Sequence, residues 1–352
     1  MEFLTEYGIF LAKALTVVIA VVIVIAAAGG AATKGKGQQK REMKVEKIND
    51  RLSDFKEELQ HAILDKDALK KLKKEASKQA KSDKKKAKEN TGTDLEKADK
   101  PRVYVIDFKG DIKASAVEAF RDSITSVLQV VNAGNDEVVV RLESPGGMVH
   151  SYGLASAQLD RIRAAGVKLT VCVDRVAASG GYMMACVADK IVASPFAIMG
   201  SIGVVAQLPN FSRLLKKNDI DYEILTAGEY KRTLTMFGEN TEKGREKFKA
   251  DLEDTHELFK SYVSERRPAV EIEKVATGDI WFGTRALEVS LVDELATSDE
   301  YLVSACANAD VFEVEFKEKQ SFAEKIGLSV SSAVEKSVEK ILSELQISRG
   351  MK

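Results

Sequence analysis

Two glycine-rich turns are the parts of the sequence best suited to carry chemistry. Ser179 lies in DRVAASGGYMMACVAD (174–189), between a strand-like run and an apolar helical stretch. A serine at such a turn has an exposed hydroxyl, and the N-terminus of the following helix stabilises developing negative charge. The segment ESPGGMVHS (143–151) holds a Pro-Gly-Gly turn, whose free backbone N–H groups could form an oxyanion hole. A helix N-cap serine and an ordinary tight turn are the simpler interpretations.

A serine becomes a nucleophile only with a base beside it. His150 is one candidate, whereas His61 and His256 lie in charged helical segments. The other kind of base is a lysine whose pKa is lowered by burial. Lys231 follows a strand-like run and a glycine turn in ILTAGEYKRTLTMF (224–237), and an apolar stretch continues after it. Position alone leaves this choice open, and a lysine base predicts that Lys231 is buried against apolar atoms.

The elements that position these residues alternate between strands and helices. The predicted strands are 103–108, 137–144, 168–173, 190–194 and 221–225. The predicted helices are 114–131, 152–165, 211–217 and 242–263. Such alternation is typical of an α/β domain, and continuous apolar strands indicate a sheet buried on both faces. Ligands in such sheets bind at the carboxyl ends of the strands, where both glycine-rich turns lie.

The N-terminal region has a different composition from this body. Tyr7–Ala28 is almost wholly apolar apart from Lys13 and is long enough to span a membrane. A cleaved signal peptide is the alternative, although Glu2 and Glu6 make its start acidic. Lysines and arginines follow the span, so a simple charge count under the positive-inside rule favours the cytoplasm for the C-terminal bulk, and the membrane face of the catalytic domain stays open.

A basic stalk follows the predicted membrane span. Residues 31–100 hold 21 Lys and Arg against 14 Asp and Glu, although the whole chain is nearly balanced at 53 against 54. Helical spacing of apolar residues over 44–72 predicts a helix, and the polar stretch 73–100 predicts a solvated linker. The lysine run could touch anionic lipid. It lacks the interleaved aromatics that single-stranded nucleic-acid binding uses, so we expect no nucleic-acid partner.

The remaining composition excludes several classes of protein. The 352 residues include only 5 Pro and 3 Cys, and the cysteines form no Cys-x-x-Cys pair. Three scattered cysteines make a disulfide scaffold unexpected, and together with only three histidines they make a metal site unexpected. We expect no cofactor.

Four segments, in order, carry a resemblance to a known family. They are ESPGGMVHS, VAASGGYMMACVADKIVASPFAIMGSIGVVAQ, LTAGEYK and GDIWFGTRALEVSLVDEL. Together with the N-terminal span and charged stalk, they resemble the SppA/SohB family of membrane-anchored serine endopeptidases. The resemblance covers the span and roughly residues 102–302. It implies a Clp protease/crotonase-like sheet-and-helix fold.

The resemblance also implies roles for individual residues. Ser179 matches the nucleophile, Lys231 the general base, and Ser201 the serine that orients that lysine. Gly180 and Gly147 match the donors of the oxyanion hole. His150 then becomes a bystander.

One segment departs from the family pattern. Ser290-Leu291-Val292-Asp293 stands where the family usually has Gly-Leu-Val-Asp. Since serine tolerates left-handed backbone less well than glycine, this turn is expected to be strained.

The resemblance implies an architecture and an assembly. The expected parts are an anchor (1–30), a basic helical stalk and linker (31–100), a serine peptidase domain (101–303) and a C-terminal strand with an amphipathic helix (304–352). Family members with one catalytic unit form rings in which neighbouring protomers share the serine and the lysine, so a ring homo-oligomer is expected. We expect a single-pass protein of the bacterial inner membrane that hydrolyses peptides or membrane-derived protein fragments. A crotonase-like acyl-CoA enzyme and a non-catalytic membrane scaffold are the alternatives.

Overall fold

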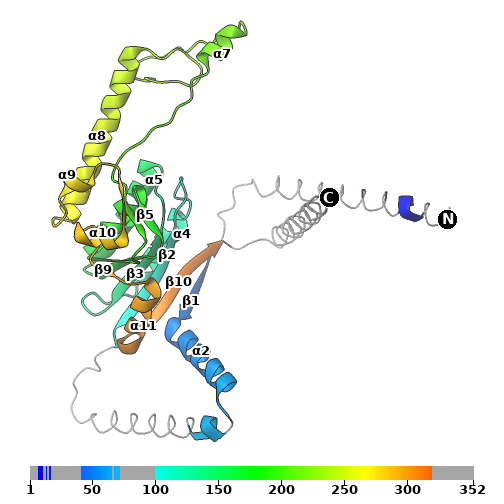
Figure 1. Ribbon diagram of the computed structural model, residues 1–352, viewed down its shortest axis with the longest axis vertical. Coiled ribbons are helices and arrows are strands. Elements are labelled where there is room, and N and C mark those ends of the chain that lie inside the picture. The colour runs from blue at the N-terminus through cyan, green and yellow to red at the C-terminus, as the bar shows by residue number, and fades with distance from the viewer. Residues whose placement is uncertain are drawn as a thin grey trace, which may run out of the picture. The chain divides into compact units, whose positions relative to one another are not determined.

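The computed structural model describes residues 7–10, 13, 16, 41–65, 67–71 and 100–318. Residues Met43–Phe316 form a single compact unit, which contains the labelled elements of Figure 1 from α2 to α11. Residues 7–10 and 67–71 are also helical.

The strands and helices alternate along this unit. The strands are β1 (Arg41–Lys47), β2 (Arg102–Lys109), β3 (Glu137–Glu143), β4 (Lys168–Val173), β5 (Val176–Ala178), β6 (Lys190–Ala193), β7 (Ile198–Gly200), β8 (Ile280–Phe282), β9 (Glu294–Leu295) and β10 (Asp310–Glu318). The helices are α2 (Ile48–Ile63), α4 (Val117–Val127), α5 (Val149–Ala164), α6 (Gly180–Ala185), α7 (Ser212–Lys217), α8 (Glu242–Arg266), α9 (Ile272–Val275), α10 (Gly283–Glu288) and α11 (Ser298–Asn308).

Two sheets organise the unit. The larger has the strand order β1-β10-β2-β3-β4-β6-β9, and its pairings from β10 to β9 are parallel. The smaller has the order β5-β7-β8, with β5 parallel and β8 antiparallel to β7. Strand β3 leads into the Pro-Gly-Gly turn, and β4 leads into β5 of the small sheet. The carboxyl edge of the large sheet therefore adjoins the small sheet.

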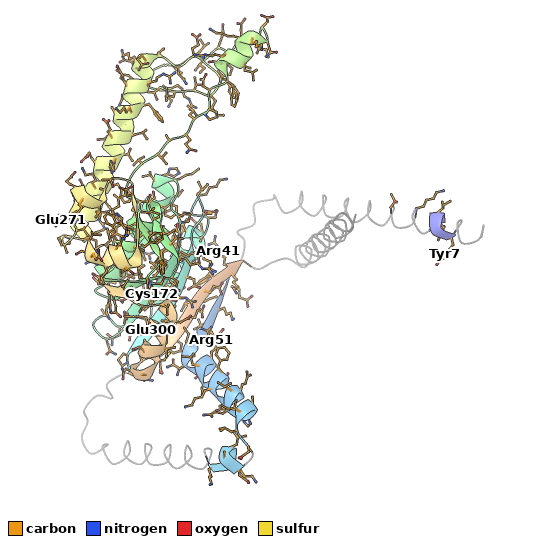
Figure 2. All side chains as sticks on the ribbon, viewed as in Figure 1. Tyr7, Arg41, Arg51, Cys172, Glu271 and Glu300 are labelled. Carbon is orange, nitrogen blue, oxygen red and sulfur yellow. The ribbon has the colours of Figure 1, made fainter. Side chains whose placement is uncertain are left out.

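Helices cover both faces of the large sheet. Val138, Val140 and Leu142 of β3 point into a core shared with α4, α5 and α6. Val139 points to the other face, into a second core with residues of α2 and α11. Figure 2 labels Cys172, which belongs to this second core. The α/β class predicted from the sequence is confirmed.

Two secondary-structure predictions were wrong. Residues 221–225 are exposed and form no strand. None of the described strands lies beside them to supply the pairing that a strand needs. The helix expected from residue 44 begins only at Ile48, because the preceding residues form β1 beside β10. The remaining predicted strands correspond to β2, β3, β4 and β6, and the predicted helices to α4, α5, α7 and α8.

The predicted membrane span and C-terminal helix fall largely outside the described residues. Of 7–28 only residues 7–10, 13 and 16 are described, and of the expected C-terminal segment 304–352 the described residues end at 318. Among the residues that are described, no helix combines the length and apolar character needed to cross a bilayer.

Candidate active site

Ser179 occupies a strained turn between β5 and α6. Its backbone angles are φ 51° and ψ −119°, the mirror image of an extended conformation and one that L-residues rarely adopt. The Ser179 N–H donates to the Gly200 carbonyl at 2.8 Å, and the Ser179 carbonyl accepts from Met183 N–H at 2.9 Å. The side chain is only half-buried, whereas Ala178 and Gly180 on either side are buried. This is the geometry of a nucleophile elbow, which holds a hydroxyl out of a rigid turn.

The Pro-Gly-Gly turn lies directly against Ser179. Ser144, at the end of β3, pairs with β5: its N–H donates to the Val176 carbonyl at 2.8 Å and its carbonyl accepts from Ala178 N–H at 3.0 Å. Gly146 has φ +91°, and a Cβ there would lie 2.7 Å from both the Ser179 Cβ and the Gly180 nitrogen. Position 146 therefore excludes any side chain, which is what allows this close approach.

Gly147 and Gly180 present two backbone amides beside this turn. The Gly180 N–H is the first of α6, so it has no acceptor within the helix. A Cβ on Gly147 would lie 2.2 Å from the Ile112 carbonyl oxygen, so the chain passes too close there for a side chain. Among the described residues no hydrogen-bond acceptor is found for either amide. Both are free to donate to a developing oxyanion.

Ser201 lies at the neighbouring strand end. In the parallel register of β5 and β7, Ala178 is opposite Gly200, so Ser179 and Ser201 each follow a paired residue at the same end of the sheet. Ser201 also has positive φ, 49°. Its N–H donates to the Asp279 carbonyl at 2.8 Å and its hydroxyl to the Gly278 carbonyl at 3.3 Å. The small sheet thus brings together two of the predicted site residues.

No hydrogen bond joins Lys231 to Ser179 in the part of the chain that the structure describes. Lys231 is exposed, and the segment from Gly203 to Lys243 contains no buried residue. Within the described residues, the Lys231 ammonium has no hydrogen bond or ion pair. The backbone N–H of Lys231 donates to the Gly228 carbonyl at 3.2 Å. Figure 1 shows α7, from the same segment, at the end of α8 away from the sheets. Among the described residues of the single chain nothing buries Lys231, so the burial expected for a lysine base is not found there.

The C-terminal part of α8 packs against the core of the unit. Phe259 and Val263 are buried, and Arg267 makes two hydrogen bonds to Asp293, at 2.8 and 2.9 Å. The Asp293 carboxylate also accepts from Ile191 N–H at 2.7 Å. Helix α8 follows the Lys231 segment in the chain. Through Arg267 and Asp293, its C-terminal end is attached to β6 of the large sheet.

The histidines take no part in this arrangement. His150 is exposed near the start of α5, and His256 Nε2 lies 3.2 Å from the Ile202 carbonyl oxygen. Across the described ranges, no group of three or more His, Cys, Asp and Glu could hold a metal ion.

Two polar residues beside the site escaped the sequence analysis. Ser144 and Tyr152 are fully buried, and their hydroxyl oxygens lie 2.5 Å apart. The available signal was a serine immediately before the Pro-Gly-Gly turn and a tyrosine on the helix that follows it. Neither pattern distinguishes a packed residue from one that holds a site.

Comparison with known proteins identifies the family. Residues 2–159 match the N-terminal part of peptidase family S49, and residues 161–311 match peptidase family S49 itself. The chain belongs to peptidase family S49. The first match includes the Pro-Gly-Gly turn, and the second includes Ser179, Ser201 and Lys231. The predicted resemblance to the SppA/SohB family is confirmed, and the chain is a serine-type peptidase.

Several named relatives of this S49 peptidase are close in sequence. Probable protease SohB of Haemophilus influenzae is 56% identical over 236 residues, 67% of each chain. Probable protease SohB of Buchnera aphidicola subsp. Schizaphis graminum is 46% identical over 304 residues, 86% of this chain and 87% of the relative. Among solved structures, the 1510-N membrane-bound stomatin-specific protease with a substrate peptide aligns at 16% identity and TM-score 0.40, covering 66% of this chain and 99% of that one.

Proposed function

We propose that this S49 peptidase is a membrane-bound serine endopeptidase that uses Ser179 and Lys231 as a catalytic dyad. The observation that carries the proposal is the strained backbone of Ser179 beside the amides of Gly147 and Gly180. Strained backbone persists where the surroundings over-determine it, and such positions concentrate at active sites. The catalytic domain of this proposal has a Clp protease/crotonase-like fold.

The chemistry needs no cofactor. Neutral Lys231 takes the proton from the Ser179 hydroxyl as the oxygen attacks the peptide carbonyl carbon. The oxyanion that forms accepts hydrogen bonds from the two glycine amides, each worth about 3 kcal/mol in the transition state. The carbon–nitrogen bond then breaks as the amine leaves with the proton from Lys231. Water hydrolyses the resulting ester by the same route, and Ser201 orients the lysine.

A second copy of the chain supplies the lysine in this proposal. A lysine works as a base where it is desolvated, and the single chain leaves Lys231 exposed. The Lys231 segment also exposes large apolar side chains, including Val205, Leu214 and Leu225. A ring homo-oligomer would cover this segment and place Lys231 of one protomer at Ser179 of the next. Such head-to-tail contacts form a ring when the rotation from one protomer to the next closes on itself.

The substrates are peptides or membrane-derived protein fragments with small to medium apolar side chains near the cleaved bond. Ile112, Met148 and Val149 beside the Pro-Gly-Gly turn are exposed by 68%, 42% and 45%, and offer an apolar surface for such side chains. The N-terminal part, residues 1–30, anchors the protein in the bacterial inner membrane with a single span, and residues 31–100 form the stalk and linker. Lipid is thus a partner, and nucleic acid is not. Digestion of intact and of opened spheroplasts by an added protease decides which face holds the peptidase domain (101–303) and the C-terminal segment (304–352).

Hydrolysis of a chromogenic ester of a capped apolar amino acid tests the dyad. We expect Ser179→Ala and Lys231→Ala each to lose at least about 1,000-fold in kcat. Co-expression of the two variants tests the sharing: a site is complete when an intact serine meets an intact neighbouring lysine, so about a quarter of wild-type activity should return.

The matched control is Ser179→Ala co-expressed with the Ser179→Ala/Lys231→Ala double variant, which should recover nothing. Full activity of Lys231→Ala would eliminate the lysine base. Failure of the mixed chains to recover activity, with both variants assembled, would eliminate the shared dyad.

A further inference from the structure

A buried pair of hydroxyl groups, those of Ser144 and Tyr152, connects the Pro-Gly-Gly turn to the loop after β2. Tyr152 Oη donates to the Asp111 carbonyl at 2.8 Å, so the Ser144 hydroxyl, 2.5 Å away, donates its hydrogen to Tyr152 Oη. Ser144 Oγ in turn accepts from Gly146 N–H at 3.1 Å. The result is one chain of hydrogen bonds from the Pro-Gly-Gly turn to the loop after β2.

The loop at the far end of this chain is itself rigid. The Asp111 carboxylate accepts hydrogen bonds from Ser115 N–H at 2.8 Å, from the Ser115 hydroxyl at 2.7 Å and from Lys113 N–H at 3.1 Å. These bonds stabilise the ionised carboxylate and so lower the pKa of Asp111. The next carbonyl, that of Ile112, accepts from Met148 N–H at 2.8 Å, directly after Gly147.

The same pair also defines the space around the start of α6. A Cβ on Gly180 would lie 2.4 Å from Tyr152 Cγ, and a Cβ on Gly181 would lie 2.5 Å from the Ser144 carbonyl oxygen. A Cβ on Gly110 would lie 2.4 Å from Tyr152 Oη and 2.5 Å from Ser144 Oγ. Three glycines therefore pack against the pair, and a fourth, Gly146, is bonded to it. The Pro-Gly-Gly turn and the start of α6, which carry the two candidate donors, thus both contact Ser144 or Tyr152.

We propose that Ser144 and Tyr152 are positioning residues of the peptidase, which hold the amides of Gly147 and Gly180 in the geometry that the transition state needs. The inference rests on the proposed function of these amides as oxyanion donors. Neither hydroxyl touches the substrate. Their effect is on the alignment of the donors, and catalysis depends steeply on such alignment.

Tyr152→Phe tests this, since it keeps the ring against Gly180 and removes only the oxygen. We expect kcat for the chromogenic ester to fall about 10-fold, with KM changed by less than about 3-fold, because the lost alignment acts on the transition state. Ser144→Ala carries the same expectation. The double variant should lose little more than either single one, because both belong to one chain of bonds. Tyr104→Phe is the matched control: it removes the hydroxyl of another buried tyrosine, on β2, and should leave kcat unchanged.

A transition-state mimic gives the decisive readout. A peptide aldehyde forms a hemiacetal with Ser179, whose former carbonyl oxygen takes the place of the oxyanion, whereas the corresponding peptide alcohol cannot. Tyr152→Phe should weaken the aldehyde about 10-fold and leave the alcohol unchanged. Equal weakening of both inhibitors, wild-type kcat in both single variants, or unfolding of both would overturn the proposal. Ser179→Ala separates this from the proposed function: if it stays active the nucleophile is wrong, and if only Tyr152→Phe stays active the positioning role alone is wrong.

Discussion

Replacing Ser179 by glycine should make the protein more stable while it abolishes activity. At φ 51° and ψ −119° the Cβ of Ser179 crowds the backbone, whereas glycine adopts this mirror-image extended conformation freely. Alanine keeps the Cβ and hence the strain. The comparison of Ser179→Gly with Ser179→Ala therefore isolates the backbone term, since both lack the hydroxyl.

The magnitude follows from two opposing contributions. Relief of the strained backbone stabilises the folded state by about 1–3 kcal/mol. The greater freedom of glycine in the unfolded chain offsets about 0.5–1 kcal/mol of this. From the midpoints of these two ranges, the free energy of unfolding of Ser179→Gly should exceed that of Ser179→Ala by about 1 kcal/mol, while Ser179→Ala stays within about 0.5 kcal/mol of the wild type. For a folded unit of this size that is a rise in Tm of about 2–4 °C.

Urea unfolding followed by tryptophan fluorescence measures this difference, because Trp281 lies on β8 in the small sheet that carries Ser179. Ester hydrolysis confirms that both variants are inactive. A Ser179→Gly protein no more stable than Ser179→Ala would show that the turn is unstrained, and the main structural reason to place the nucleophile there would be lost.

Three further predictions concern the framework of the site. Ser290, where the family usually has glycine, has φ 61°, so Ser290→Gly should raise the free energy of unfolding by about 0.5–1 kcal/mol at unchanged kcat; a loss of stability in urea would contradict this. Arg267 is nearly buried against Asp293, so Arg267→Met should cost about 3 kcal/mol in urea unfolding, and adding Asp293→Asn should recover part of that loss; a cost below about 1 kcal/mol would refute the role of the pair. Burial raises the pKa of the Cys172 thiol from 9.0 to about 12, so the stability that the protonated thiol contributes is complete below pH 9 and is lost as pH rises toward 12. The free energy of unfolding should therefore fall less steeply with alkaline pH in Cys172→Ala than in the wild type. An identical fall in both proteins would contradict this prediction.

The large sheet was predictable because its strands carry their own signal. β2, β3, β4 and β6 are short runs of apolar, often β-branched residues, and burial on both faces requires such runs. The strained turn at Ser290 was also predictable, since serine stood where a left-handed turn prefers glycine, and its φ of 61° confirms it.

The small sheet and the ends of the unit were not predictable in this way. β5, β7 and β8 are three residues each, too short for a periodic pattern, yet they set the register of Ser179 and Ser201. β1 looks helical by spacing and becomes a strand because β10 lies beside it, and a local pattern contains no information about such a partner. The opposite occurred at 221–225, where a strand-like composition has no strand to pair with among the described residues.

The sequence supplied the candidate residues of the site and not the contacts around them. Ser179, Gly147 and Gly180 came from motifs and the family resemblance, and the structure packs Gly146, the neighbour of Gly147, against Ser179 and Gly180. The pair that holds this turn, Ser144 and Tyr152, depends on contacts between β3, α5 and the loop after β2. Under the proposed function Lys231 reaches the Ser179 of a neighbouring protomer, so its position relative to that serine cannot be predicted from a pattern within one chain.

Labelling with a serine-directed acylating or phosphonylating probe tests the central claim most directly. Purified full-length protein is treated with a fluorophosphonate, and the modified residue is located by peptide mapping and mass spectrometry. We predict a single stoichiometric adduct on Ser179 in the wild type, and a rate of labelling at least about 100-fold lower in Lys231→Ala, where the hydroxyl has no base. An adduct on a different serine, or an unmodified Ser179 in protein that hydrolyses peptides, would contradict the account.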